Sequence, residues 1–343
     1  MEKLLILIFC LFWGCAVDQP LSSNTDNVSS IQITPFGTDN SLDIITWNVE
    51  NFPKNGNNTV DAMVDIIRDL DIEIFAFQEI ESSSSFNNLI SSLECSEIVS
   101  TSFGDCNEYL GWANTENGCA EIIGCNNDIN YNFYLDYEDC NKTCNAEWDG
   151  FRSNSASYSM NLAYLYNKSK VTINNIYELY NDDWWSFPRS PLVLELTYNG
   201  IELILINNHF KCCDGSEDRR ESAMNLLHQY VIDEFNNKRV IILGDLNDSI
   251  TDSESSNVFI NIINDSSFYF ADISIATGPA SNWSFPTYPS HIDHIIISNE
   301  LFDNFDNDIK TIKIDEELNG GWSEYDLKIS DHRPLGIRLN FNN

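Results

Sequence analysis

Residues 240–248 read VIILGDLND, an apolar run that ends in polar side chains. The first residues are typical of a buried strand, and Asp245 and Asn247 follow directly after it. A single Gly-Asp-x-Asn segment is more often a turn than a functional site, because Asp and Asn favour turns. The segment indicates the fold only together with five other stretches of the chain, which also place polar side chains beside an apolar, strand-like run.

The other five segments also place polar side chains beside apolar, strand-like runs. They are ITWNVEN with Asn48, FAFQEIE with Glu79, INNHFKC with His209, SHIDHII with Asp293, and ISDHRP with Asp331 and His332. Carboxylate and carboxamide oxygens suit Mg²⁺, Mn²⁺ or Ca²⁺, and imidazoles suit proton transfer near neutral pH. Hydrolysis of a phosphoester needs both a cation that offsets charge and a base that activates water.

Composition and charge limit the alternatives. The 343 residues are 43% hydrophobic, which provides material for a substantial core and excludes a disordered or fibrous chain. The chain has 18 Lys and Arg against 53 Asp and Glu, a net charge of −35. Such a chain does not bind phosphate polymers through bulk charge, since that requires many cationic side chains. An enzyme with a phosphate substrate therefore needs a metal cation or a few local cations.

Strand-like runs alternate with helical ones along the chain. Apolar residues at helical spacing predict helices at 60–70, 86–93 and 217–235. We predict strands at 42–47, 72–77, 162–166, 171–179, 192–197, 201–207, 240–244, 292–298 and 335–341. Many strands and few helices indicate two packed sheets with helices outside.

The order of the six segments resembles the endonuclease/exonuclease/phosphatase superfamily, which has the DNase I-like fold, over about residues 41–341. The resemblance implies an α+β fold, a four-layer α/β/β/α sandwich with the site at one end of the sheets. It also implies divalent-metal-dependent cleavage of phosphoesters, with Mg²⁺ or Mn²⁺ as the cofactor and Ca²⁺ as an alternative, structural ion.

The resemblance also implies roles for the polar residues. Asn48, Glu79 and Asp331 look like metal ligands. Asp293 looks like the carboxylate that orients His332 and raises its basicity. The other members of the set look like groups that orient the attacking water or flank the phosphorus: Asp245, Asn247 and His209. Which of the two imidazoles is the general base stays open.

Two further matches concern substrate binding. Arg189, in the segment SFPRSP at 186–191, resembles the Arg-x-Pro segment of secreted DNases and implies a contact with a phosphate oxygen. Tyr158 stands where DNase-like members place a Tyr that contacts phosphate. Two departures weaken duplex DNA as a substrate: Glu81 replaces a cation, and Met160 replaces a carboxylate that pairs with the first His.

His291 precedes Asp293 by two residues. Alternation along a strand predicts that it faces the same side as Asp293, as an extra phosphate contact. An imidazole at the edge of a sheet is the alternative.

The N-terminus is typical of an exported protein. Residues 1–14 predict a signal peptide, because one Lys precedes a short apolar run. Cys15 follows Gly14 and resembles a lipobox, which predicts a membrane-anchored bacterial lipoprotein of the outer membrane or cell surface, with ordinary secretion as the alternative. The polar stretch 15–40 predicts a flexible tether that leads into one domain at 41–343.

Cysteine usage agrees with export, since eight cysteines remain after Cys10 and Cys15 and predict disulfides rather than zinc. Six of them lie between residues 95 and 144, which predicts a Cys-rich insertion at about 95–150. We expect the adjacent Cys212 and Cys213 to bridge to different cysteines, because a ring between neighbours is strained.

Together these features predict an exported, monomeric, metal-dependent phosphodiesterase that cleaves DNA or RNA and touches a membrane only through its lipid anchor. A phospholipid or small-phosphoester hydrolase, similar to sphingomyelinases or inositol phosphatases, is the alternative, and the pair Trp184 and Trp185 is its candidate lipid contact. A binding protein without activity is disfavoured by the intact set of polar residues.

Overall fold

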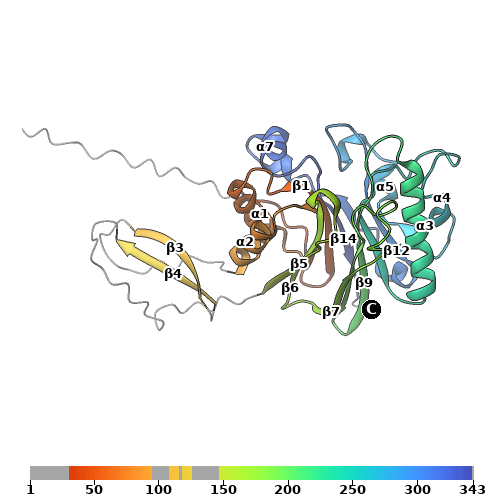
Figure 1. Cartoon of the computed structure of the whole chain (residues 1–343). Helices are drawn as coiled ribbons and strands as arrows, with labels where there is room; N and C mark the ends of the chain where they lie inside the picture. The colour runs from red at the N-terminus through yellow and green to blue at the C-terminus, as the bar shows by residue number, and fades with distance from the viewer. Residues whose placement is uncertain (1–30, 95–107, 116–117, 126–146, 342–343) are drawn as a thin grey trace, which may run out of the picture. The chain divides into compact units, whose positions relative to one another are not determined.

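Two six-stranded sheets pack face to face in the computed structural model, which describes residues 31–94, 108–115, 118–125 and 147–341 (Figure 1). In spatial order, the first sheet consists of β13 (Ile309–Thr311), β14 (Leu335–Leu339), β1 (Leu42–Phe52), β2 (Ile74–Ile80), β6 (Asn161–Asn167) and β5 (Trp148–Arg152). The second consists of β11 (Phe268–Phe270), β12 (Asp293–Ser298), β10 (Val240–Asp245), β9 (Ile201–His209), β8 (Leu192–Tyr198) and β7 (Thr172–Glu178).

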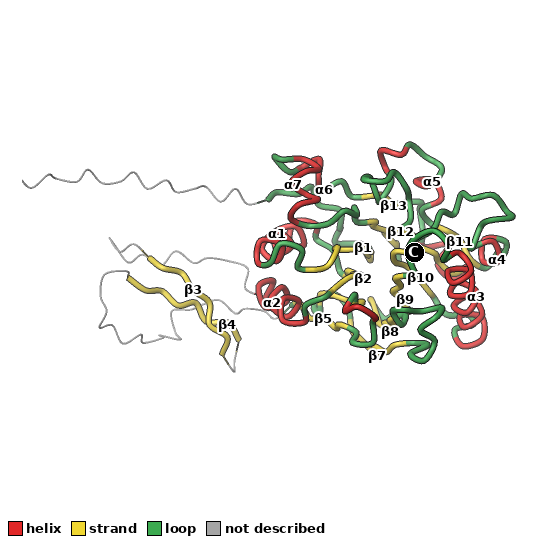
Figure 2. Tube along the Cα trace, turned by 45° about the horizontal axis from the view of Figure 1, so that its top comes forward, coloured by secondary structure: helices red, strands yellow, loops and turns green. Residues whose placement is uncertain are grey.

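Helices cover the outer faces of both sheets, as Figure 2 shows. The helices beside the first sheet are α1 (Asn57–Leu70), α2 (Ser83–Glu94), α6 (Ile314–Glu317) and α7 (Gly321–Lys328). Those beside the second are α3 (Glu217–Glu234), α4 (Ile260–Ile263) and α5 (Ile273–Ala276). Short 3₁₀ helices lie at Ser157–Ser159, Ala280–Asn282 and Asn299–Asn304. The four layers confirm the predicted α/β/β/α sandwich.

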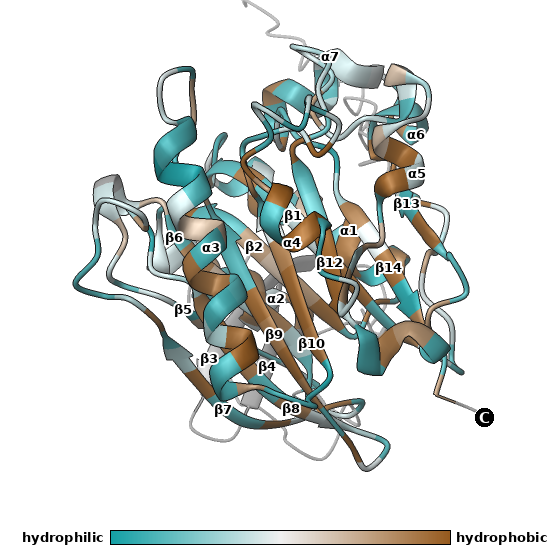
Figure 3. Cartoon of the chain, turned by 90° about the vertical axis from the view of Figure 1, so that its right-hand side faces the viewer, coloured by the Kyte–Doolittle hydropathy of each residue, from teal (hydrophilic) through white to brown (hydrophobic). Residues whose placement is uncertain are grey.

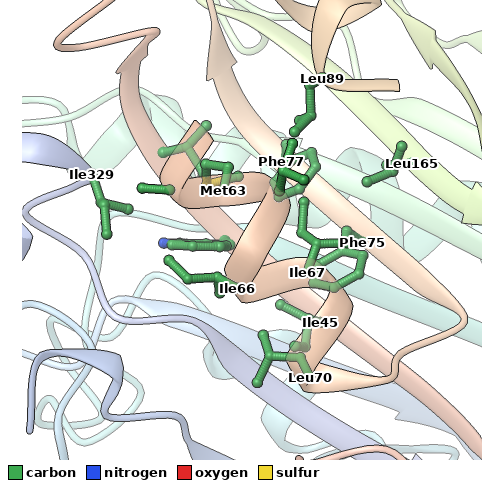
Figure 4. Packing of buried hydrophobic residues seen from close by; sticks show 14 of the residues in the cluster. Ile45, Met63, Ile66, Ile67, Leu70, Phe75, Phe77, Leu89, Leu165 and Ile329 are labelled. Atoms are coloured by element: carbon green, nitrogen blue, oxygen red, sulfur yellow. The ribbon is translucent and has the colours of Figure 1, made fainter. Parts of the chain in front are cut away.

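Each pair of neighbouring layers encloses an apolar core. Ile66 and Ile67 follow Met63 by three and four residues on α1, and all three belong to one buried cluster with Phe75 and Phe77 of β2 (Figure 4). The second sheet is covered in the same way by the apolar stripe of α3, which lies in front of the apolar β9 and β10 in Figure 3.

The topology gathers the polar ends of the strands at one edge. β1 runs parallel to β2, and β9 runs parallel to β10, so their carboxyl ends meet at the same side of the sandwich. The register pairs Asn48 with Gln78 and pairs Asp245 with His209. β12 is antiparallel to β10 and begins there, so Asp293 lies opposite Asp245. Residues far apart in the sequence therefore line one edge.

Residues 31–40 differ from the predicted tether. Ile33 and Phe36 are only 5% and 3% exposed and belong to the core beneath α1. The backbone N–H groups of Phe36 and Gly37 both donate to the carbonyl of Leu70. The stretch is polar overall, so its composition did not indicate that two of its apolar side chains are buried in the core. The folded domain therefore begins before residue 41.

The cysteine-rich insertion is described only in part. β3 (Glu108–Thr115) and β4 (Gly118–Cys125) form an antiparallel pair, and the first sheet resumes with β5. The predicted signal peptide, the lipidation at Cys15, and four cysteines of the insertion lie outside the described residues: Cys95, Cys106, Cys140 and Cys144. No helix in the described ranges has both the length and the apolar character needed to cross a membrane.

Candidate active site

Bulges in β1 and β2 aim Glu79 into the site. The register of β1 with β2 shifts after Asn48, and that of β2 with β6 shifts after Phe77. At the bulge Glu79 adopts a φ of 64°, in the left-handed region that non-glycine residues rarely enter. Its Oε2 accepts a hydrogen bond from the backbone N–H of Asn51, at 3.0 Å. Such strain at a polar residue is typical of functional sites.

Asn48 connects the two sheets. Its Nδ2 donates to Oε1 of Glu79 at 3.2 Å and to Oδ2 of Asp245 at 3.0 Å. Its Oδ1 accepts from the backbone N–H of Glu50 at 3.0 Å. The backbone N–H of Asn247 donates to Oδ1 of Asp245 at 3.0 Å, so both carboxylate oxygens of Asp245 are held in place.

His332 and Asp293 form a buried pair. Nδ1 of His332 lies 2.7 Å from Oδ2 of Asp293, which turns Nε2 toward Asp245 and Asp331 at 4.0 and 3.9 Å. Burial lowers the pKa of the imidazole, but the carboxylates of Asp293 and Asp245 outweigh burial and raise it to about 10. His332 is therefore an imidazolium at neutral pH.

His209 has the opposite character. Its Nε2 lies 3.4 Å from Oδ2 of Asp245 and 3.8 Å from Oε1 of Glu79. Burial and the positive charge of Arg189 hold its pKa well below the usual range, so the imidazole is neutral. Its Nδ1 has no hydrogen-bond partner among the described residues. Met160, where the sequence analysis expected a carboxylate to be missing, places its sulfur 2.8 Å from Nη2 of Arg189.

Arg189 is the cation of the site. It is only 7% exposed, and its Nη1 donates to the carbonyl of Phe210 at 3.3 Å. Its Nε is buried and has no acceptor within the described part of the chain. Burial lowers the pKa of the Arg189 guanidinium, and the carboxylates of Glu79 and Asp245 act in the opposite direction. A buried donor without an acceptor suits an anionic ligand.

The carboxylates crowd together at the same edge. Burial and the charge of Asp293 raise the pKa of Asp245 to about 7. Burial raises the pKa of Asp331 to about 6, with the charges of Glu50 and Glu79 adding to the rise. Buried carboxylates that repel one another in this way fit a bound cation, and hard oxygen donors fit Mg²⁺ or Mn²⁺. Asp245, Asp293 and His332 lie close enough together to hold an ion. The predicted ligands lie around this group: Asn48 contacts Glu79 and Asp245, and Asp331 lies 3.9 Å from Nε2 of His332.

Two predicted residues are less central. Nδ2 of Asn247 donates to the carbonyl of Phe210 at 3.2 Å, which fixes the loop after β10. Tyr158 lies in the 3₁₀ helix Ser157–Ser159, and its side chain is outside the described part of the structure.

The predicted phosphate contact at His291 is wrong. Its Nε2 lies 3.0 Å from Oδ2 of Asp272, and Nδ1 of His294 lies 2.7 Å from the same oxygen. Nε2 of His294 lies 2.9 Å from the carbonyl of Asp248, so this buried cluster braces the loop after β10. The alternation rule failed because β12 begins only at Asp293, and His291 precedes the strand.

Two site residues were missed by the sequence analysis. Glu50 accepts the backbone N–H of Asp331 at 2.9 Å and forms an ion pair with Lys54. The ring of Phe285 stacks on the imidazole of His332, with centroids 4.7 Å apart. Glu50 follows Asn48 by two residues, a weak sequence signal, whereas nothing in the sequence near Phe285 indicates its contact.

Comparisons with known proteins agree with this fold. Three solved structures each match 88% of the chain. Human nocturnin's catalytic domain with bound sulfate has a TM-score of 0.56, 12% identity and 95% of its own length covered. D. rerio TDP2 complexed with single strand DNA product has a TM-score of 0.56 and 14% identity, and 100% of its own length is covered. An endonuclease/exonuclease/phosphatase from Bacteroides vulgatus has a TM-score of 0.52 and 14% identity, and 98% of its own length is covered.

No curated protein sequence matches the chain significantly. The sequence model described as Endonuclease/Exonuclease/phosphatase family, in contrast, matches residues 45–332. That range includes the strands that carry Asn48, Glu79, His209 and Asp245, and it ends at His332. The chain therefore belongs to the Endonuclease/Exonuclease/phosphatase family, an enzyme family of phosphoric ester hydrolases.

Proposed function

We propose that the protein is a divalent-metal-dependent phosphodiesterase that hydrolyses single-stranded nucleic acid. The proposal depends on one observation: two carboxylates and two imidazoles lie together at one edge of the sandwich. His209 lies 3.8 Å from Glu79 and 3.4 Å from Asp245, and His332 lies 4.0 Å from Asp245. Beside them Arg189 offers a buried donor with no acceptor in the described part of the chain.

A cation held by Glu79, Asp331 and Asn48 supplies positive charge beside the phosphate oxygens when it is bound. Asp245 accepts the proton of the attacking water, since a pKa of about 7 matches a general base near neutral pH. The imidazolium of His332 donates from Nε2 to a phosphate oxygen, and Asp293 keeps it charged and oriented.

The neutral His209, whose Nε2 lies 3.4 Å from Oδ2 of Asp245, provides a second imidazole hydrogen bond to the phosphate, in addition to that of His332. Arg189 binds a further phosphate oxygen through its free Nε. His332 and Arg189 are held by their own hydrogen bonds before substrate arrives, which is the condition for stabilising charge that develops during the reaction.

Single strands are favoured over duplex DNA by charge and by comparison. With a net charge of −35, the protein repels a duplex, which carries two phosphates per base pair. One structural neighbour, TDP2, is complexed with single strand DNA product, and that complex supports a strand as the substrate here.

The test is a panel of single- and double-stranded DNA, RNA and sphingomyelin, each with Mg²⁺, Mn²⁺ or EDTA. We expect hydrolysis of single strands that EDTA abolishes. His209→Ala should lower kcat at least about 100-fold, in line with loss of a group that acts on the reacting phosphate. His228→Ala, outside the site on α3, should retain activity. Full activity of the His209 variant contradicts the proposal.

A phospholipid substrate is the second candidate, and one observation favours it. Trp184 and Trp185 are 71% and 44% exposed in the loop before Arg189. Exposed aromatic side chains next to a phosphodiesterase site suit the surface of a membrane. Cleavage of sphingomyelin without cleavage of any nucleic acid would select this candidate.

We also propose that the protein is exported and anchored through Cys15. The N-terminal sequence supports this proposal. Metabolic labelling with a radioactive fatty acid should mark the chain, and Cys15→Ser should abolish the label.

A further inference from the structure

Cys212 and Cys213 lie side by side on the loop that follows β9. Their Sγ atoms are 2.8 Å apart, less than 1 Å longer than the roughly 2.05 Å of a disulfide bond. Among the described residues neither sulfur is bonded to another cysteine. Cys213 is exposed and Cys212 is half-buried, so a small reagent reaches the pair.

Arg220 holds the backbone on both sides of Cys212 in place, and we call this pair of hydrogen bonds the Arg220 clamp. Nη1 of the buried Arg220 donates to the carbonyls of Lys211 and Cys213, at 2.9 and 3.0 Å. Cys213 adopts a φ of 77°, in the left-handed region that residues with a side chain rarely enter. The clamp therefore maintains a strained turn that brings adjacent side chains to the same side.

A positive charge stands beside the pair. Nζ of Lys211 lies 3.5 Å from Sγ of Cys212 and donates to the carbonyl of the same residue at 3.2 Å. A thiolate is the nucleophile in exchange with a disulfide. We assign Cys212, whose Sγ faces Nζ of Lys211, as the attacking sulfur, and Cys213 as the sulfur that resolves the product.

We propose that Cys212 and Cys213 form a reversible disulfide with each other, a modification site that reacts with small-molecule disulfides. The thiolate of Cys212 attacks the reagent, forms a mixed disulfide and releases one thiol. The thiol of Cys213 then attacks Sγ of Cys212 and releases the second thiol. The protein loses two hydrogens, and the reagent gains them as two thiols. Because the ring is strained, the bond is readily reduced again.

The same clamp couples the pair to the catalytic edge. Nε of Arg220 donates to Oδ2 of Asp248 at 2.7 Å, and Asp248 directly follows Asn247 in the loop after β10. Closing a ring between the sulfurs rotates the peptide that Arg220 holds at Cys213. The rotation is passed to Arg220 and to Asp248, so oxidation displaces the loop after β10, which carries Asn247 and follows Asp245 directly.

The test begins with mass spectrometry and needs no assumption about substrate. The full chain is treated with oxidised glutathione, its free thiols are alkylated, and it is digested with trypsin. Cleavage after Lys211 and Arg219 yields the peptide 212–219, CCDGSEDR, which holds both sulfurs and no other cysteine. We expect this peptide unalkylated and about 2 Da lighter than its reduced form. Cys213→Ser should retain one glutathione on Cys212.

The coupling is tested with bis(4-nitrophenyl) phosphate as a generic phosphodiester. We expect oxidised glutathione to lower kcat/KM about tenfold, as for a small displacement of catalytic groups, and dithiothreitol to restore it. The double variant Cys212→Ser, Cys213→Ser should keep its activity with either reagent, which controls for the other cysteines.

Three results overturn the proposal. Peptide 212–219 linked to a peptide from another segment shows that the sulfurs pair elsewhere. Alkylation of both sulfurs after oxidation shows that the ring does not form. A closed ring with unchanged kcat/KM refutes the coupling through Arg220. The first two results concern mass alone and are independent of the proposed function.

Discussion

Replacing Asp293 by Asn tests the proposed role of the charged His332 imidazole most directly. The substitution keeps the size of the side chain and an oxygen that accepts the Nδ1 hydrogen bond of His332. It removes the negative charge 2.7 Å from that ring. The change therefore separates the charge of Asp293 from its role in positioning.

The structure gives the size of the effect. The pKa of His332 is raised from 6.5 to about 10 although burial acts against the rise, and Asp293 is the main cause. A rise of this size corresponds to roughly 5 kcal/mol of favourable interaction with the charged ring. We expect the pKa of His332 in Asp293→Asn to fall to 6.5 or below. At pH 8 the ring is then neutral, and kcat should fall about 100-fold or more.

The sign of the stability change follows from the direction of the shift. A pKa raised in the folded state stabilises the fold fully below 6.5, and this contribution is lost as the pH rises through about 10. The unfolding free energies of the wild type and Asp293→Asn should therefore differ most at pH 6 and converge toward pH 10. Urea denaturation across this range measures the difference.

The pKa itself is measured by NMR titration of the imidazole in EDTA, with the resonance assigned from its absence in His332→Gln. Asp265→Asn is the matched control, because His228 and Asp265 form a contact of 2.9 Å outside the site. That variant should leave the titration of His332 and kcat unchanged. A His332 that still titrates near 10 in Asp293→Asn would refute the reasoning.

Two other predictions concern the scaffold. Burial raises the pKa of Glu73 to about 7, so its contribution to stability is full below pH 4.5 and is lost as the pH rises through 7. Glu73→Gln should remove about 3 kcal/mol of this pH dependence, and a Tm profile that keeps its slope between pH 4.5 and 8 contradicts the assignment. Gly244 has a φ of 140°, and a Cβ there would lie 2.0 Å from the carbonyl oxygen of Asn208. Gly244→Ala should cost about 3 kcal/mol or more in urea denaturation. Gly200→Ala, with a φ of 81° and open space around it, should cost about 1 kcal/mol; equal losses would mean that the close approach at Gly244 has no effect.

Much of the site was predictable because it depends on strand ends. Asn48, His209 and Asp245 each complete or follow an apolar run, and the parallel pairing of the central strands brings such ends together. The pairing of His332 with Asp293 follows from family resemblance and from the position of Asp293 at the start of β12. These features are encoded by local pattern and order along the chain.

Other features depend on contacts that no local pattern encodes. The direction of Glu79 comes from a bulge and a left-handed φ, which the apolar run of β2 does not reveal. His291 was misplaced because alternation holds only inside a strand. Ile33 and Phe36 join the core next to the end of α1, where the backbone N–H of Phe36 donates to the carbonyl of Leu70, although most of their neighbours in sequence are polar.

The hydrogen bonds of Asn48 have a consequence for when the protein becomes active. Glu79 belongs to one sheet and Asp245 to the other, and Asn48 spans the seam between them. Neither half of the molecule contains a working hydrolase by itself. The site is therefore complete only once both sheets have docked, so we expect hydrolysis to appear together with the fully folded chain.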